Sequence, residues 1–498
     1  MHRREFLGGV AAAAAGQSKL AAQAAKPGAR FNAIQMGPHS LCDEGIDHAL
    51  DLIQDTASIN TVMVYSHMYH GGYGKPIQMF APDHGVTPRD TRNRKLPMVW
   101  VKYHEQSFKN TSLRHPAAGA GVEYANRDLF TEMLPAIRKR GMKLYARILE
   151  GAGRDAADHI LNYAKVETRD VNGQASTTPC WNHPEYRAWW TATVEDMFRS
   201  YELDGLQWGA ERQGPLMNAI LPWNNNPPSC FCEFCRARGR ANGIDPERAR
   251  QGYANLYRYV QDLMTGKGKP ADGVFAEFLG VLIRYPEILS WEYQYRRSRE
   301  EMQEAIYRAV KAIKPDAQVG WHVDHQPSSW DIVYRAEMSY AEMAPYSDFI
   351  KFIAYHDVLR PRIRFWYLAR LQRTVLSELS LKESLDLYYD VFGYDKSREP
   401  GVDQLATTGF SPDYVFRETR RSVASAEGKT KVYPGIGFDV PWGANPIPAD
   451  PDKVYECVKK AFEGGGAGIV VSREYEEMRV ANLKAVGRAM REIDRNRG

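Results

Sequence analysis

The sequence predicts an α/β protein, a (β/α)8 barrel with long helical insertions after strands 2, 4 and 6. Short apolar, β-branched runs alternate with longer amphipathic runs along the chain, which is the pattern of strands followed by helices. Eight of the short runs have strand character, the number that closes such a barrel. A doubly wound open sheet is the alternative, but no Gly-x-Gly-x-x-Gly fingerprint follows the first run.

The eight expected strands are residues 32–36, 61–66, 143–150, 205–209, 318–323, 349–355, 431–438 and 468–472. Amphipathic runs between and after them predict helices over residues 44–56, 127–140, 184–201, 337–344, 451–463 and 480–495. Gly141 directly follows one of these runs, where a glycine is the usual helix stop. The alternation therefore continues to the end of the chain, as a barrel requires.

Three connections are much longer than a barrel needs: residues 67–126, 212–317 and 358–429. We expect an added strand at 98–103 in the first. The second holds a cysteine-rich segment and long helices at about 252–264 and 274–313, and the third is mostly helical in pattern. Loops that follow barrel strands build the active site, so insertions there favour an enzyme, with an interaction surface as the alternative.

Composition excludes several classes of protein. The chain has 498 residues, 44% hydrophobic and 25% charged, which excludes disordered, collagen-like and coiled-coil proteins. Its 65 Lys and Arg nearly balance 61 Asp and Glu without a long basic run, so no nucleic-acid partner is expected. The aromatic content of 11% suits stacking on flat ligand faces, although a large core alone also produces it.

The N-terminus has the pattern of an export signal. Arg3 and Arg4 precede a weakly apolar run, and small residues follow at a cleavage spacing, so residues 1–24 are expected to be a twin-arginine signal peptide. Residues 30–498 would then form the barrel domain, in the periplasm or outside the cell. No other stretch has membrane-spanning length, so no membrane contact is expected after cleavage. A homo-oligomer is compatible with the sequence.

Polar and aromatic residues gather where the expected strands end. They are Glu150, Trp208, Glu211, Trp321, His322, Asp324, Tyr355, His356, Asp357, Asp439, Trp442, Arg473 and Glu474. Strand ends of a barrel meet at one mouth, so these side chains are expected to face a substrate there. Neighbouring carboxyl groups differ in proton affinity, which is the condition for dividing acid and base roles between them.

Glu211 is the leading catalytic candidate. It follows an apolar strand beside Trp208, so burial would favour its protonated form and a role as general acid. Asp439 and Asp324 are the leading candidates for its carboxylate partner, Glu474 is the third, and Asp357 and Glu150 are further alternatives. Carboxyl groups about 5–5.5 Å apart imply a retaining glycosidase, and about 6.5–9.5 Å an inverting one, a choice the sequence leaves open.

The remaining strand-end residues are expected to bind the substrate. Trp208, Trp321, Trp442 and Tyr355 would stack on sugar rings, and His322, His356 and Arg473 would bind hydroxyl groups. Asp357, Glu150 and Glu474 complete this polar rim.

Four of the six cysteines have metal-ligand spacing. Cys230, Cys232 and Cys235 form a C-x-C-x-x-C run, and Cys180 lies fifty residues upstream. Three thiolates on one loop and a fourth from elsewhere predict a closed, structural zinc site. A disulfide such as Cys232–Cys235 is the alternative in an oxidising compartment. No organic cofactor is expected.

A catalytic Glu after strand four, followed by a C-x-C-x-x-C cluster with one earlier cysteine, resembles the family 42 β-galactosidases. The resemblance covers about residues 180–240, and it assigns the proton donor to Glu211 and the zinc ligands to Cys180, Cys230, Cys232 and Cys235. That family has Asn where this chain has Ala210, and its nucleophile is a Glu on strand seven, where this chain has Asp439. The resemblance therefore implies a glycoside hydrolase of a divergent family.

Two other functions remain open at this stage. A metal-dependent sugar isomerase or epimerase would use histidine and carboxylate ligands, which the strand ends supply in His322, Asp324, His325, Asp357, Glu150 and Glu211. A carbohydrate-binding barrel without activity is the third hypothesis. Chelator dependence separates the isomerase from the hydrolase, and binding without turnover identifies the binding protein.

Overall fold

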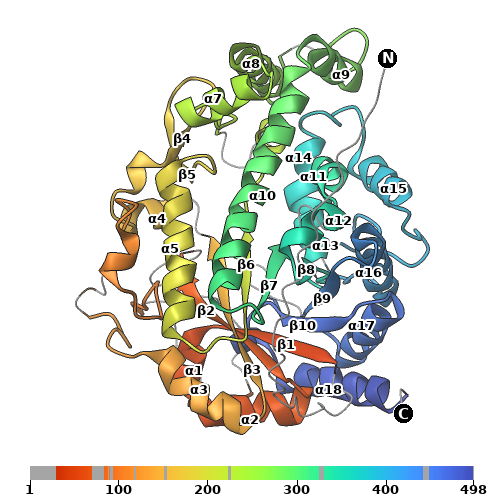
Figure 1. Cartoon of the computed structure of the whole chain (residues 1–498). Coiled ribbons are helices and arrows are strands. Elements are labelled where there is room, and N and C mark those ends of the chain that lie inside the picture. The colour runs from red at the N-terminus through yellow and green to blue at the C-terminus, as the bar shows by residue number, and fades with distance from the viewer. Residues whose placement is uncertain are drawn as a thin grey trace, which may run out of the picture.

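A computed structural model describes residues 30–496, except 70–82, 88, 90–93, 117–118, 120, 151–153, 222–225, 268, 325–329, 406 and 441–447. Eight parallel strands close into a barrel in the order β1-β10-β9-β8-β7-β6-β3-β2 (Figure 1). The prediction of a (β/α)8 barrel is confirmed. The expected signal peptide and Trp442 lie outside the described residues.

All eight expected strands are present. The barrel strands are β1 (Phe31–Met36), β2 (Thr61–Met68), β3 (Lys143–Glu150), β6 (Gly205–Ala210), β7 (Gln318–Val323), β8 (Phe349–Ile353), β9 (Lys431–Gly437) and β10 (Gly468–Ser472). A separate antiparallel hairpin pairs β4 (Glu167–Arg169) with β5 (Ala175–Pro179). The added strand expected at 98–103 does not form: only an isolated bridge joins Val99 to His67 at the end of β2.

Helices follow or flank the barrel strands as expected. They are α1 (Pro38–Glu44), α2 (Ile46–Ala57), α3 (Leu129–Lys139), α4 (Arg154–His159), α5 (Pro184–Ser200), α6 (Pro215–Ile220), α7 (Glu233–Ala241), α8 (Pro246–Met264), α9 (Val274–Arg284), α10 (Glu287–Ile313), α11 (Ile332–Glu337), α12 (Tyr340–Met343), α13 (Leu359–Arg362), α14 (Ala369–Leu371), α15 (Leu381–Phe392), α16 (Pro412–Ala426), α17 (Pro451–Glu463) and α18 (Val480–Arg495). The segment η5 (Ile363–Leu368) is π-helical, and short 3-10 turns lie at Glu105–Phe108, Tyr163–Lys165, Ala344–Tyr346 and Tyr475–Glu477.

The helix expected over 274–313 is two helices, α9 and α10. Pro286 separates them, and the residue before a proline is excluded from helical geometry by the proline ring. Tyr285 accordingly has φ −130° and ψ 70°. Other helices begin where an acceptor side chain precedes a proline, as Asp245 does for α8 and Asp450 does for α17.

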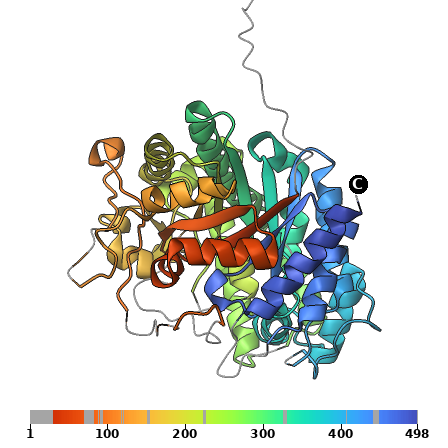
Figure 2. The ribbon, with the colours of Figure 1, turned by 90° about the horizontal axis from the view of Figure 1, so that it is seen from below.

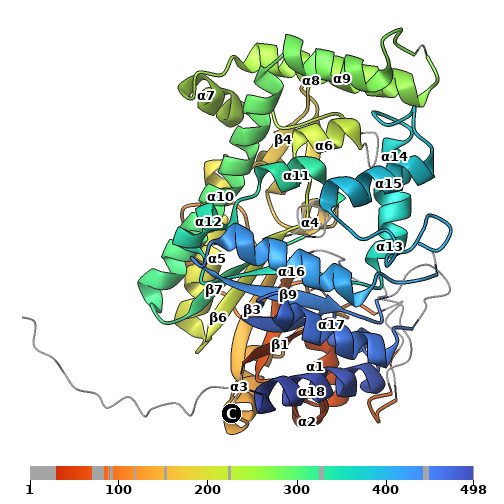
Figure 3. The same ribbon diagram turned by 90° about the vertical axis from the view of Figure 1, so that its right-hand side faces the viewer.

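The insertion after β6 extends away from the barrel. Figure 1 shows α7, α8 and α9 at the end of the molecule farthest from α2 and α18, and Figure 3 shows α8 and α9 there from the side. The long helix α10 returns from them and packs against α5. Across the described residues, no helix combines the length and apolar character that a membrane crossing requires.

Side chains along each barrel strand alternate between the interior and the surrounding helices. Gln35 on β1 and Gln207 on β6 point inward, because their side-chain amides lie 2.7 Å apart across the barrel. Trp208, the next residue, points outward and contacts Trp190 of α5. Residues 207, 209 and 211 therefore belong to the inner face of that strand and its end.

Aromatic rings fill the base of the barrel. Phe31, Tyr145, Phe349 and Tyr433 pack together with small apolar neighbours, and the rings of Phe31 and Tyr433 stack with centroids 4.2 Å apart. Figure 2 shows this end from below, where α2 and α18 cover the outside of the barrel. The strand C-termini form the opposite end, which places the candidate site there.

Candidate functional site

Three inward residues from two neighbouring strands converge at the mouth. Glu211 follows β6, and His322 and Asp324 come from the end of β7. The Nε2 atom of His322 lies 3.1 Å from Oε1 of Glu211, and one ligand atom from each of the three residues lies within 4.8 Å of the others. The Glu211 side chain is 26% exposed and that of His322 is 5% exposed. Glu211 is therefore the most exposed member of the group.

Lys351 lies below this group in the barrel interior. Its Nζ atom is 3.3 Å from Nδ1 of His322 and donates a hydrogen bond to the hydroxyl of Tyr355 at 3.0 Å. Burial, followed by the charge of Arg147, holds the pKa of Lys351 well below its ordinary value. Burial and the neighbouring Lys351 also lower the pKa of His322 to about 4. The imidazole is therefore neutral near pH 7.

Glycines leave room for these large inward side chains. A Cβ at Gly435 on β9 would lie 2.5 Å from Cε of Lys351, and one at Gly437 would lie 2.3 Å from the Tyr355 ring. Contacts that short are not tolerated between atoms that are not bonded, so a larger residue at either position would displace the side chain beside it.

A second charged pair lies beside the first group. Arg147 of β3 forms an ion pair with Glu474, which follows β10, at 2.9 Å, and the Tyr65 hydroxyl donates to the same carboxylate at 3.3 Å. Burial raises the pKa of Glu474 although Arg147 opposes the shift. Glu474 thus faces the mouth as expected, but its carboxylate is already held by two partners.

Two more arginines complete the mouth. Arg473 pairs with Glu477 on the next turn, where Nε of Arg473 lies 2.8 Å from Oε1 of Glu477. Arg362, the last residue of α13, lies over the Trp366 ring at 4.7 Å, and no carboxylate of the described residues forms an ion pair with it.

Three residues expected at the mouth lie on the outer face of the barrel instead. Trp208 and Trp321 are opposite each other in register and are fully buried among aromatic side chains, so neither ring has a face free for a sugar. Glu150 is buried against the helices, where Nη2 of Arg212 lies 3.0 Å from its Oε1 and Tyr186 of α5 also donates to it. Each of the three residues lies an odd number of positions from a residue of the same strand whose side chain points into the barrel. Its own side chain therefore points outward.

Asp439 is held by structural hydrogen bonds. Its carboxylate accepts from the backbone N–H groups of Ala449 and Arg479 at 3.1 and 2.9 Å, and from the Asn482 amide at 2.8 Å. It therefore joins the end of β9 to the start of α18.

His356 and Asp357 lie in a neighbouring buried group rather than with Glu211. Burial lowers the pKa of His356 to about 3, and it raises the pKa of Asp357 to about 7 with help from the charge of Asp439. Tyr355, the residue before them, faces the interior beside Lys351.

Lys351, Arg147 and Arg362 were not among the residues that sequence reasoning selected. A lysine inside the apolar run 349–353 was a signal, because a fully buried lysine is rare unless it has a specific partner or function. Arg147 gave the same signal within the expected third strand. Arg362 has no such mark in the sequence, because it lies in a segment with several other arginines.

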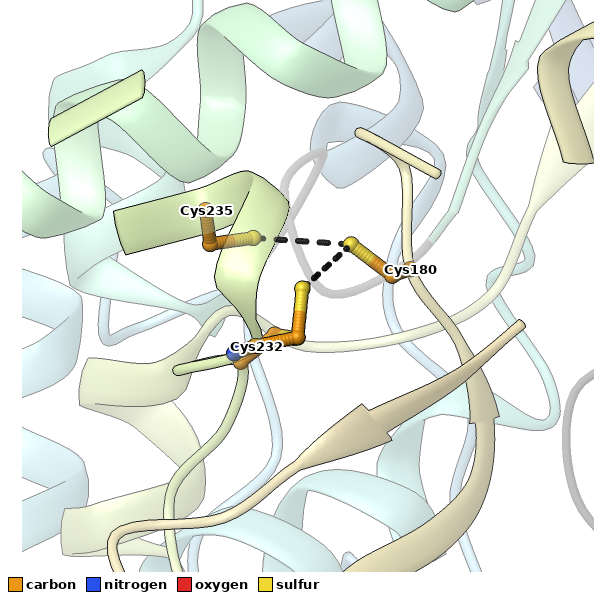
Figure 4. A group of neighbouring side chains, drawn as sticks. Cys180, Cys232 and Cys235 are labelled. Carbon is orange, nitrogen blue, oxygen red and sulfur yellow. Dashed lines mark hydrogen bonds between the residues drawn. The ribbon is translucent and has the colours of Figure 1, made fainter. Parts of the chain in front are cut away.

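The four cysteines expected to bind zinc come together, and Figure 4 shows three of them, Cys180, Cys232 and Cys235. One sulfur atom from each of Cys180, Cys230, Cys232 and Cys235 lies within 4.8 Å of the others, and Sγ of Cys180 is 3.5 Å from that of Cys232 and 3.4 Å from that of Cys235. All six cysteines of the chain are free thiols, and these separations far exceed the 2.05 Å of a disulfide bond.

The surroundings of the cluster suit thiolate ligands. The backbone N–H and side-chain amide of Asn182 donate to Cys180 and Cys235, both at 3.3 Å. Hydrogen bonds from the three neighbouring thiols lower the pKa of Cys232 below its usual value. Four sulfurs without another ligand type are the donor set of a closed tetrahedral zinc site, so this group can hold a metal ion.

Comparison with known proteins supports the fold and no closer relationship. No protein-family model and no curated protein matches the sequence. Among solved structures, a β-galactosidase from the haloarchaeon Halorubrum lacusprofundi matches with a TM-score of 0.50 at 11% identity, over 93% of this chain and 58% of that one. A β-galactosidase from Marinomonas ef1 matches with a TM-score of 0.48 at 10% identity, over 93% of this chain and 59% of the other.

The glycoside hydrolase domain of PgaB (BpsB) from Bordetella bronchiseptica matches with a TM-score of 0.47 at 13% identity, over 93% of this chain and 99% of that domain. This chain thus spans less than two thirds of the two β-galactosidases and nearly all of the PgaB domain. At these identities the likeness concerns the fold alone. The chain therefore shares the (β/α)8 barrel fold with these enzymes.

Proposed function

We propose that the protein is a glycoside hydrolase in which Glu211 is the general acid and Asp324 is the second carboxylate. One observation carries the proposal: carboxylate oxygens of Glu211 and Asp324 lie within 4.8 Å of each other at the barrel mouth. This separation is close to that of retaining enzymes and too short to place a water between the two groups, as an inverting enzyme must. Asp439 is not proposed as the partner because its carboxylate is held by backbone and side-chain donors.

The network below Glu211 would set its hydrogen bonding. If Lys351 donates to Nδ1 of His322, the proton of the neutral ring lies on Nε2, which then donates to Oε1 of Glu211. The other oxygen of Glu211 would carry the acid proton. Two carboxylates this close repel each other when both are charged, which favours a pair with one proton.

The reaction then proceeds in two steps. Glu211 gives its proton to the glycosidic oxygen while an oxygen of Asp324 bonds to the anomeric carbon, and the bond from that carbon to the leaving alcohol breaks. In the second step Glu211 takes a proton from water, the water oxygen bonds to the anomeric carbon, and the ester to Asp324 breaks. The sugar is released with its original configuration, and both carboxyl groups return to their starting states.

The experiment is a panel of aryl α- and β-glycosides incubated with the mature protein, with and without EDTA. We expect aryl alcohol release that EDTA does not change and that Glu211→Gln abolishes. Asp324→Ala should lose hydrolysis and, with an activated glycoside and added azide, form a glycosyl azide of inverted configuration. Activity that survives Glu211→Gln would contradict the assignment of the acid, and a product of inverted configuration from the unaltered enzyme would contradict that of Asp324.

A metal-dependent sugar isomerase or epimerase is the second candidate. The same observation favours it, because Glu211, His322 and Asp324 supply a carboxylate–imidazole set close enough to bind one divalent cation. It predicts no glycoside cleavage, interconversion of free sugars with added Mn²⁺, and loss of that activity in EDTA. Aryl alcohol release in the glycoside panel, and a free-sugar assay with Mn²⁺ run with and without EDTA, therefore distinguish the two functions.

We further propose that the cysteine cluster holds a structural zinc ion, loaded in the cytoplasm before export through the twin-arginine pathway. The four converging sulfurs support the metal, and Arg3 and Arg4 in the leader support the route. Metal analysis of the purified protein should give about one zinc per chain, and Cys232→Ser should reduce the zinc content and lower the unfolding temperature. A metal-free protein with unchanged stability would contradict this.

A further inference from the structure

One arginine at the mouth differs from its neighbours, because no carboxylate in the described part of the chain forms an ion pair with it. Arg147 pairs with Glu474, Arg212 with Glu150 and Arg473 with Glu477, each within hydrogen-bond distance. The Nε atom of Arg362 is buried and has no hydrogen-bond partner, and the ring of Trp366 is the neighbour that its guanidinium covers. A buried donor atom without an acceptor is rare, because it has lost its hydration and gained no partner.

The position of Arg362 places this guanidinium at the candidate site. It ends the short helix that follows β8, on the same end of the barrel as Glu211. The charged groups that act on it most strongly are Arg473, Glu211 and Asp324. Arg473 repels it and burial penalises its charge, and together these lower the pKa of Arg362 despite the two carboxylates. Among the described residues, Arg473 thus has Glu477 as its ion-pair partner, whereas Arg362 forms an ion pair with none.

We propose that Arg362, with Arg473 beside it, binds an acidic group of the substrate, so that the enzyme acts on anionic glycosides. The group would be a carboxylate, as in a uronic acid, or a sulfate ester, since a guanidinium fork fits the paired oxygens of either. An anion bound there would accept from the unpartnered Nε of Arg362 and reduce the repulsion between the two guanidinium groups. This inference rests on the proposed glycoside hydrolase function and specifies its substrate class.

The first experiment compares aryl glucuronides, aryl galacturonides and aryl 6-sulfoglycosides with the matching neutral glycosides. We expect kcat/KM to favour one acidic series, with uronides and sulfated sugars tested separately to identify the group. Arg362→Met should lower kcat/KM for that series by about 10- to 100-fold, as loss of a charge-assisted hydrogen bond predicts, mainly through KM. Its effect on neutral glycosides should be about twofold or less.

Arg364→Met is the matched control. Arg364 lies two residues further along the same segment, but its Nη1 has an acceptor, the backbone carbonyl of Val402 at 3.3 Å. This variant loses the same charge and should retain the preference for acidic substrates. Arg362→Lys keeps the charge without the fork and should lie between the wild type and Arg362→Met. Unfolding temperatures identify any variant that fails to fold.

A binding measurement separates failure of this inference from failure of the proposed function. Free glucuronate, galacturonate, glucose 6-sulfate and glucose are titrated by calorimetry into the unaltered protein and into Glu211→Gln. Cleavage of neutral glycosides with no preference for acidic ones, and equal binding of glucose and the acidic sugars, would overturn the inference and leave the hydrolase standing. Binding of an acidic sugar that depends on Arg362, without cleavage of any glycoside, would overturn the hydrolase instead. Equal losses of binding affinity for acidic and neutral sugars in Arg362→Met would also contradict the inference.

Discussion

Replacement of Arg212 by methionine is the sharpest test of how the site is supported. Arg212 directly follows Glu211, and its side chain is enclosed on three sides: Nη2 lies 3.0 Å from Oε1 of Glu150, Nη1 donates to the carbonyl of Pro179, and Cζ lies 3.4 Å from the centroid of the Trp181 ring. Methionine keeps much of the length of the stem and removes the charge and all donors.

The magnitude follows from the burial of the ion pair. The side chain of Arg212 is 8% exposed and that of Glu150 is 0% exposed, so the variant leaves a buried carboxylate without its cation. Removing one partner of such a pair destabilises a protein by about 3–5 kcal/mol. The guanidinium stacked on Trp181 contributes to the same loss, by about 1–2 kcal/mol in a desolvated setting.

Urea unfolding followed by tryptophan fluorescence measures the effect. We expect a lower midpoint for Arg212→Met and partial recovery in the double variant Arg212→Met/Glu150→Gln, because the amide leaves no unpaired charge. The activity of the folded variant should also fall, since Arg212 fixes the backbone next to Glu211. A loss of less than about 1 kcal/mol, or a double variant as unstable as the sum of both single variants, would refute the reasoning.

Two further predictions concern buried charge and packing. Burial and the charge of Glu292 raise the pKa of Glu337 to about 9, so its contribution to stability is present below pH 4.5 and is lost as pH rises towards 9. Between pH 6 and 9, the unfolding temperature of Glu337→Gln should therefore fall less than that of the unaltered protein. Equal falls in the two proteins would contradict this prediction. Gly435→Ala would bring a methyl group to 2.5 Å from Lys351 and should lower stability by about 1–3 kcal/mol. Gly401→Ala is the control in the same urea titration, because its added methyl group would meet its nearest neighbour, Oε1 of Gln404, at an ordinary 3.9 Å. Equal urea midpoints for the two variants would contradict the packing argument.

The sequence predicted the strands well because each is a short, largely apolar run, and most contain β-branched residues. The sequence predicted less well which side chains point into the barrel. Side chains alternate between the two faces of a strand, so an error of one residue in position reverses the predicted direction. Trp208 lies next to Gln207 and Trp321 next to His322, and in each pair only the second-named residue faces inward. Strand-end position alone could not make that distinction.

The role of Asp439 shows a different limit. Its partners Ala449, Arg479 and Asn482 lie 10 to 43 residues further along the chain, so no local pattern marks it as a structural carboxylate. Cys180 and the C-x-C-x-x-C run are also distant in sequence, but cysteines are few and their spacing is specific for metal binding. A long-range contact can be predicted from one sequence where the residue type is rare and its chemistry narrow.

The aromatic rings that fill the base of the barrel determine how substrate and water reach the candidate site. Phe31 and Tyr433 stack beneath Tyr145 and Phe349, so the polar network around Lys351 is closed from below. Substrate, leaving group and water must then enter and leave through the same opening. A sugar bound there would block solvent access to the interior of the barrel. The protons that Glu211, His322 and Lys351 hold when the sugar binds would then be those available for one turnover.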